Sequence, residues 1–263
     1  MPLTEADSAA IDRIAALIRP ETRVLFVTGA GLSADSGLPT YRGVGGIYGD
    51  RPTRHGCSIE VALSGPMIRA RPEITWEALR ELEEAGRGAR PNRGHEAIVE
   101  LERHCSAAWV LTQNVDGFHK IAGSRNVIDI HGDLRHLVCS RRPLCDYAEE
   151  VTSYAHLEPV PKCPRCGGLV RPDVVLFGEM LDPGKIAKLR REQDQGFGLV
   201  FSIGTSSLFP YIVEPVLSAI DDDIPTVEIN PGETELSGLV AYRIQAGAAE
   251  ALGRLIERVR GGR

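Results

Sequence analysis

The stretch VLTQNVDGFHKIAGSRNVIDIHG, residues 110–132, decides the fold, because it contains the ends of two short apolar runs that both stop at polar residues. The first run, residues 108–111, opens into Thr112-Gln113-Asn114-Val115-Asp116. The second, residues 127–130, ends at His131-Gly132. Open α/β sheets bind their ligands at the carboxyl ends of the strands. We therefore interpret both runs as parallel strands whose ends line a ligand site.

Four other apolar runs end in the same way, at Gly, Asn or Ser followed by a polar cluster. They are RVLFVTGAG, PDVVLFGE, GLVFSIGTSS and PTVEIN. Continuous apolar strands separated by helical stretches predict a parallel sheet that is covered on both faces. The predicted fold class is α/β, a Rossmann-like parallel-sheet domain with a smaller inserted lobe.

Two stretches interrupt the alternation and are assigned to the smaller lobe. Residues 43–92 are rich in Arg, Glu, Gly and Pro and hold one expected helix, near residues 73–84. Residues 136–171 contain four cysteines. We expect these two stretches to form a small helical and zinc-binding lobe. We expect the remainder, residues 1–42, 93–135 and 172–263, to form the Rossmann-like domain.

Composition and charge exclude several classes of function. The chain has 263 residues, of which 43% are hydrophobic and 25% charged, and its net charge is −6. This charge argues against general nucleic-acid binding, which needs clustered Lys and Arg. No apolar run reaches the roughly 20 residues of a membrane span. The first residues form an expected amphipathic helix that ends at Pro20 and carry no targeting signal, so we expect a cytoplasmic protein.

The sequence Gly29-Ala30-Gly31-Leu32-Ser33-Ala34 follows the first strand and matches the glycine-rich fingerprint of dinucleotide-binding loops. Glycines let the backbone approach a pyrophosphate, and the next helix offers free amide groups to it. A tight turn between strand and helix is the alternative explanation. The acidic residue that dehydrogenases place about 20 residues further on has no convincing counterpart here. We therefore favour a use of a dinucleotide other than hydride transfer.

Four of the six cysteines form two pairs, Cys139 with Cys145 and Cys163 with Cys166. Four thiolates suit tetrahedral Zn²⁺, and a closed site of this kind is structural rather than catalytic. Free thiols in a reducing compartment are the alternative. We expect one structural zinc ion.

Taken together, the motifs resemble those of the sirtuins, a family of NAD-dependent protein lysine deacylases. The motifs are GAGLSADSGLPTYR, TQNVDGFHKIAGS, IDIHG, RPDVVLFGE, GTSS and VEIN, in the family's order, together with the paired cysteines. The resemblance extends over residues 23–255. It implies that NAD is a co-substrate and that the partners are acyl-lysine peptides or proteins, with no membrane and no specific nucleic acid.

The resemblance also implies roles for individual residues. His131 is the implied catalytic base, because histidine has a pKa that suits proton removal at neutral pH. The implied NAD-binding residues are Gly29, Ala30, Gly31, Ser33, Tyr41, Arg42, Gln113, Asn114, Asp116, Gly204, Thr205, Ser206, Asn230 and Ala248. The implied acyl-lysine residues are Val175, Phe177, Gly178 and Glu179. His119 is expected at the surface.

The acyl group that the enzyme removes is expected to be short and uncharged, with acetyl favoured. Sirtuins that remove acidic acyl groups carry a Tyr-x-x-Arg pair, and Leu79 and Leu82 occupy those places here. The turn GTSSLFPYIVEP also departs from the family, because its first proline comes one residue early. The rival functions are an ADP-ribosyltransferase or NAD glycohydrolase on the same scaffold, a non-catalytic NAD- or zinc-binding module, and an NAD-dependent dehydrogenase.

Overall fold

A computed structural model describes residues 2–39 and 52–262 of the chain. The strands are β1 (Arg23–Thr28), β2 (Ala107–Thr112), β3 (Val127–Asp129), β4 (Gly132–Cys139), β5 (Ala148–Glu150), β6 (Val170–Val174), β7 (Leu199–Ile203), β8 (Thr226–Ile229) and β9 (Tyr242–Ile244). The helices are α1 (Glu5–Leu17), α2 (Ala30–Ala34), α3 (Ile59–Ala62), α4 (Gly65–Ala70), α5 (Pro72–Gly86), α6 (Arg93–Leu101), η1 (Glu102–His104), α7 (Phe118–Ala122), α8 (Pro183–Asp194), α9 (Pro210–Asp221) and α10 (Ala248–Gly261).

The larger lobe is built on a six-stranded sheet in the order β3-β2-β1-β7-β8-β9. Every neighbouring pair in this sheet is parallel. From β1 the chain adds β2 and β3 on one side, and from β7 it adds β8 and β9 on the other side. The boundary between β1 and β7 is therefore the switch point at which such sheets bind ligands. The predicted Rossmann-like parallel sheet is confirmed.

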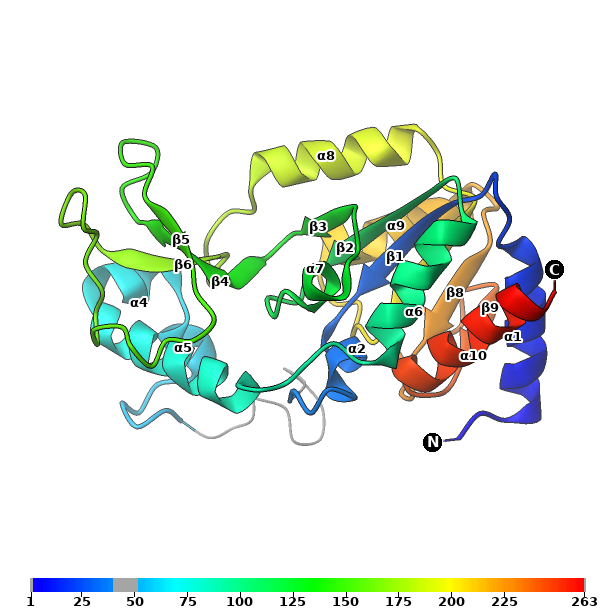
Figure 1. Ribbon diagram of the computed structural model, residues 1–263, viewed down its shortest axis with the longest axis horizontal. Coiled ribbons are helices and arrows are strands. Elements are labelled where there is room, and N and C mark those ends of the chain that lie inside the picture. The colour runs from blue at the N-terminus through cyan, green and yellow to red at the C-terminus, as the bar shows by residue number, and fades with distance from the viewer. Residues whose placement is uncertain (1, 40–51, 263) are drawn as a thin grey trace.

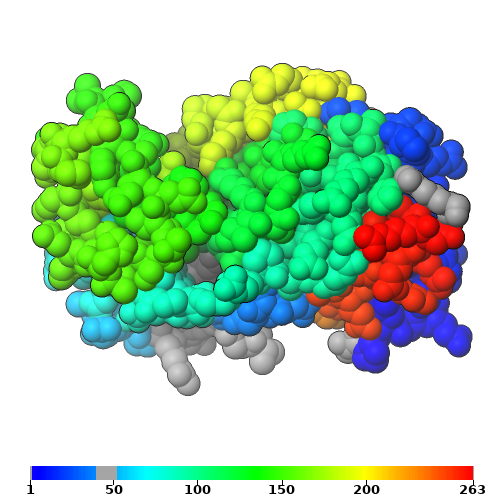
Figure 2. Space-filling view, viewed as in Figure 1, coloured from blue at the N-terminus to red at the C-terminus, as the bar shows by residue number. Residues whose placement is uncertain are grey.

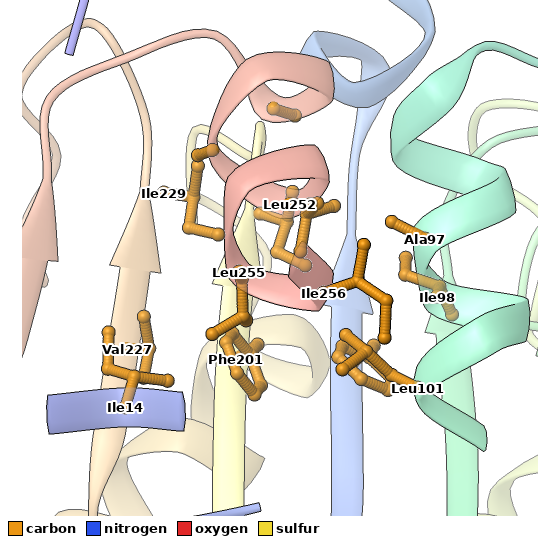
Figure 3. Close-up of a cluster of buried hydrophobic side chains, with 14 of the residues drawn as sticks. Ile14, Ala97, Ile98, Leu101, Phe201, Val227, Ile229, Leu252, Leu255 and Ile256 are labelled. Carbon is orange, nitrogen blue, oxygen red and sulfur yellow. The ribbon is translucent and has the colours of Figure 1, made fainter. Parts of the chain in front are cut away.

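Helices cover both faces of this sheet. Successive side chains along each strand point alternately to one face and the other. Val24 and Phe26 of β1 pack on the side of α1, α6 and α10, whereas Leu25 and Val27 pack on the side of α8 and α9. The close-up of the first layer shows apolar side chains of α6 and α10 directed at the strands (Figure 3). Each fully buried aliphatic side chain contributes about 1.5–3 kcal/mol, so these two layers supply most of the burial that fixes the strand ends.

The smaller lobe contains the antiparallel sheet β5-β4-β6 and the helices α3, α4 and α5. It lies at one end of the elongated molecule (Figures 1 and 2). Its core is a separate cluster that includes Trp76, Leu79 and Tyr154. The segment 52–92 forms three helices, whereas the sequence led us to expect one.

The sequence-based prediction assigned one strand to the wrong sheet. The run PDVVLFGE does not join the parallel sheet. Its first three residues end β6, which pairs antiparallel with β4, and the rest forms an irregular connection to α8. An apolar run of this length does not reveal its partner strand. The sixth parallel strand is instead β9, which is too short to give a clear sequence signal.

Two of the predicted lobe boundaries fall inside strands. The cuts after residue 135 and before residue 172 fall inside β4 and β6, which pair with each other. The cut after residue 42 lies outside the described residues. Among residues 2–39 and 52–262, no helix combines the length and the apolar composition that a membrane crossing requires.

Candidate active site

Two glycine-rich turns cross at the switch point between β1 and β7. The Gly31 N–H donates to the Gly204 carbonyl at 2.8 Å. A Cβ atom on Gly31 would lie 2.6 Å from the Cα atom of Gly204, which no real side chain tolerates. Gly204 itself has a φ of +57°, in the left-handed region that favours glycine. These glycines therefore allow the two turns to touch each other, in addition to any approach to a pyrophosphate.

A buried polar cluster lies beside the first turn. The Ser33 hydroxyl donates to an Asp116 carboxylate oxygen at 2.7 Å, and the Asn114 amide donates to the Gly29 carbonyl at 3.0 Å and to Ser33 Oγ at 3.2 Å. Asp116 also accepts the Phe118 N–H at 2.8 Å, so it caps the following turn as well. Burial raises the pKa of Asp116, while these two donated hydrogen bonds oppose the rise.

The cluster contains one unsatisfied acceptor. Asn114 Oδ1 is buried and has no hydrogen-bond partner among the described residues. A buried polar atom without a partner costs about 1–3 kcal/mol, so it indicates a group that the site binds. The carboxamide of a nicotinamide ring has the N–H donors that this oxygen lacks. The residues therefore fit NAD at this position.

The second turn continues the same surface toward β8. Gln113 Nε2 donates to Thr205 Oγ1 at 2.6 Å, and Asn230 Nδ2 donates to the Thr205 carbonyl at 3.0 Å. Ser206 is exposed beside them, and Ala248 is buried at the first residue of α10. Thr205 thus connects the ends of β2, β7 and β8, three of the strand ends that the sirtuin resemblance assigns to the dinucleotide.

His131 follows β3 and faces this surface. Its Nδ1 lies 3.0 Å from the Gln113 carbonyl oxygen, and its Nε2 lies 2.6 Å from the Tyr211 hydroxyl. Burial lowers the pKa of His131; the bond to Gln113 raises it, and the nearby charge of Lys185 lowers it further. A lowered pKa keeps the imidazole neutral at pH 7, as a general base requires.

The segment 175–179 runs from His131 to the smaller lobe. The Val175 N–H donates to the His131 carbonyl at 2.9 Å, and the Phe177 N–H donates to the Leu63 carbonyl at 2.9 Å. Gly178 is exposed, with a φ of +77°, and Glu179 forms an ion pair with Arg171 at 2.6 Å. The four predicted acyl-lysine residues therefore lie on one connection between the lobes, next to the histidine.

The four paired cysteines converge in the smaller lobe. Their Sγ atoms all lie within 4.8 Å of one another, with Cys139 and Cys166 at 3.5 Å and Cys145 and Cys163 at 3.7 Å. Tetrahedral Zn²⁺ with Zn–S bonds of about 2.3 Å would separate its sulfur ligands by about 3.8 Å. All four cysteines fit a structural zinc ion, including the widely spaced first pair.

Two expectations about individual residues, and one residue that the sequence did not reveal, need comment. His119 is not at the surface: it is 2% exposed, and its Nε2 lies 3.0 Å from Thr28 Oγ1. Tyr41 and Arg42, predicted to contact NAD, lie outside the described residues. Tyr211 was missed, although the early proline in its turn marks the place where the sequence departs from the sirtuin pattern.

The fold and the strand-end residues define a dinucleotide-binding α/β protein with a four-cysteine module. Residues 29–210 match the Sir2 family, and the chain belongs to this family. It is 47% identical over 253 residues to NAD-dependent protein deacylase 2 of Pseudomonas aeruginosa, covering 95% of this chain and 97% of the relative. It is 38% identical over 245 residues to NAD-dependent protein deacylase 1 of Archaeoglobus fulgidus, covering 90% and 93%.

Solved structures agree with this assignment. A complex of a Sir2 homolog with NAD matches with a TM-score of 0.83 and 34% identity, over 95% of this chain and 94% of the other. A complex of Sir2 with a peptide and NAD+ matches with a TM-score of 0.78 and 26% identity, over 95% and 98%.

Proposed function

We propose that this chain is an NAD-dependent protein lysine deacylase that acts first on acetyl-lysine, releases nicotinamide and transfers the acyl group to ADP-ribose. The observation that carries this proposal is the position of His131 beside the buried cluster of Ser33, Asn114 and Asp116, at the switch point of a Sir2-family sheet. The cytoplasmic location and the lack of a nucleic-acid partner are part of the same proposal.

Bound NAD would supply a ribose carbon that becomes strongly electrophilic as nicotinamide departs, which an amide oxygen can attack. The chain must then hold the leaving group and exclude water. Asn114 Oδ1, without a partner, is available to the carboxamide of nicotinamide. Ser33 and Asp116 keep the Asn114 side chain in place through Ser33 Oγ. Gln113, Thr205 and Asn230 form the neighbouring wall for the ribose and adenosine.

His131 is the general base of the proposal. Its Nδ1 faces a backbone carbonyl, which only accepts hydrogen bonds, so Nδ1 carries the hydrogen and Nε2 holds the free lone pair. In this tautomer Nε2 can take a proton from a ribose hydroxyl. The acyl-lysine side chain is expected to reach the site along Val175, Phe177, Gly178 and Glu179. The peptide backbone would pair there as an added strand.

The preference for short, uncharged acyl groups follows from α5. Leu79 is 1% exposed within the apolar cluster of the smaller lobe. Arg80 is engaged with the backbone carbonyls of Tyr154, Leu157 and Glu158, so it is committed elsewhere. We expect kcat/KM on an acetyl-lysine peptide to exceed that on the matched succinyl-lysine peptide by at least about tenfold, since an unpaired buried carboxylate is costly. A succinyl preference would refute this.

The decisive experiment identifies every product. Purified protein is incubated with NAD and an acetyl-lysine peptide, and the mixture is analysed by mass spectrometry. Equal amounts of O-acetyl-ADP-ribose, nicotinamide and deacetylated peptide support the proposal. ADP-ribosylated protein, or free ADP-ribose without deacetylated peptide, would instead identify a transferase or a glycohydrolase.

A further inference from the structure

We propose that Tyr211 is a positioning residue that blocks the basic nitrogen of His131 in the NAD-free enzyme and is displaced when NAD binds. This inference rests on the proposed function, because it takes His131 as the base. It concerns a residue at which the sequence departs from the sirtuin pattern.

The hydrogen-bond directions follow from the partners of His131. The Gln113 carbonyl fixes the hydrogen on Nδ1, so Nε2 of the neutral ring is an acceptor. The Tyr211 hydroxyl therefore donates to Nε2, at 2.6 Å. Burial raises the pKa of Tyr211 to about 12, so the phenol keeps its proton throughout the neutral range. The one lone pair that could accept a proton from NAD is already occupied.

The early proline places Tyr211 in the first turn of α9. Pro210 is the first residue of α9, where its fixed φ favours a helix start, and Tyr211 follows in the first turn. The Tyr211 ring stacks on Phe209, with centroids 5.5 Å apart and planes at 16°. Both rings contact the His131 ring edge to face, at 5.7 and 5.8 Å. Two aromatic rings thus hold the imidazole from one side.

Displacement follows from the number of acceptor sites on the ring. Nε2 has a single lone pair, so it cannot accept from Tyr211 and from a ribose hydroxyl at once. Lys185, on α8, is the charged group whose field reaches His131, and it is paired with Asp129 at 2.9 Å. Its ammonium group also donates to the Asp129 carbonyl, at 2.7 Å. The tyrosine bond must therefore break before proton transfer begins, and we assign this break to the binding of NAD.

The first test needs no turnover. The ¹⁵N resonance of His131 Nε2 is recorded in the NAD-free protein and in Tyr211→Phe, which keeps the ring stack and removes only the hydroxyl. We expect the resonance to move toward the position of an unbonded, unprotonated nitrogen in the variant. Tyr242→Phe, on β9 away from the site, is the matched control and should leave the resonance unchanged.

The second test separates displacement from proton relay. Breaking a neutral hydrogen bond weakens binding by about fivefold, so Tyr211→Phe should bind NAD about fivefold more tightly by calorimetry. Its kcat should stay within about twofold of the parent, because the bond is already broken when chemistry starts. A relay through the phenol predicts the opposite, a loss of kcat of tenfold or more.

An unshifted Nε2 resonance, an equal or weaker affinity for NAD, or a tenfold loss of kcat would each overturn the inference. Melting temperature is measured alongside to confirm that the variant is folded. Failure of the proposed function has a different signature: His131→Ala would keep its turnover, whatever Tyr211→Phe does to the free enzyme.

Discussion

The two lobes of this chain bury their interiors with different kinds of residue. The larger lobe encloses its sheet with aliphatic and aromatic side chains such as Ile14, Phe201 and Leu255, all of them fully buried. In the smaller lobe three of the buried core residues are cysteines, namely Cys139, Cys145 and Cys163, and the largest side chain there, Trp76, donates to a backbone carbonyl. The comparison leads us to expect that burial alone stabilises the larger lobe, whereas the smaller lobe also needs its zinc ion.

The two lobes also contribute different parts of the candidate active site. The groups that would contact NAD follow strands of the larger sheet, and no zinc ligand is among them. The zinc module instead supports β4 and β6, which continue into His131 and the segment 175–179. Chemistry in one lobe and metal-dependent rigidity in the other can therefore be separated by experiment.

The largest expected effect comes from loss of a zinc ligand. Cys163→Ser should release the metal and lower the free energy of unfolding of the smaller lobe by several kcal/mol, since structural zinc contributes about 10 kcal/mol to folding in small domains. Metal content and calorimetric melting measure this. Cys57→Ser, in the same lobe but outside the cluster, should retain the metal and melt within a few degrees of the parent. A Cys163→Ser protein with full metal content would contradict a four-thiolate site.

The next effect is on chemistry alone. His131→Ala should reduce kcat on acetyl-lysine peptide by about 10²- to 10⁴-fold, the usual contribution of a positioned base. Metal content and melting temperature should stay close to those of the parent, because the residue belongs to neither core. His156→Ala, at an exposed histidine, is the control. If kcat stayed within a few-fold of the parent, His131 would not be the base.

The smallest effect is a pH dependence that belongs to the larger lobe. Burial lowers the pKa of His95 to about 4, from about 6.5 in the unfolded chain. As the pH falls, the unfolded state therefore binds a proton before the folded state does. The contribution of His95 to the free energy of unfolding is fully present above pH 6.5, and about 3 kcal/mol of it is lost as the pH falls toward 4. The pKa of His119, whose ring contacts that of His95, is lowered in the same direction by burial.

Calorimetry between pH 7.5 and 4 measures this loss. His95→Phe should flatten the decline of melting temperature with falling pH, although it also removes a helix cap and lowers the melting temperature at every pH. His156→Gln should keep the full slope. An unchanged slope in His95→Phe would show that His95 is protonated equally well in both states.

Many features of the two lobes could be predicted from the sequence. The strand ends at Thr112, Asp129 and Ile203 follow directly from apolar runs that stop at polar residues, because a parallel strand buried on both faces leaves no other pattern. The four cysteines were also predictable, since paired thiols in one segment have few other uses. Both signals are local, and each is complete within a few residues.

The errors concern partners that are distant in the sequence. The run PDVVLFGE looks like a core strand, but its pairing with β4 depends on where the chain turns back. His119 follows a polar strand end, and nothing nearby reveals that its Nε2 pairs with Thr28 Oγ1. The contact of Tyr211 with His131 joins positions 80 residues apart. Residue type and spacing do not specify such pairs.

The crossing of the two glycine turns limits how this enzyme could be redesigned. Gly31 and Gly204 block each other's substitution, since a methyl group on either one would collide with the backbone of the other. Engineering a different nucleotide preference would therefore have to leave both positions intact. Exposed neighbours such as Ser206 offer the route instead, because their side chains can be varied while the backbone crossing stays closed.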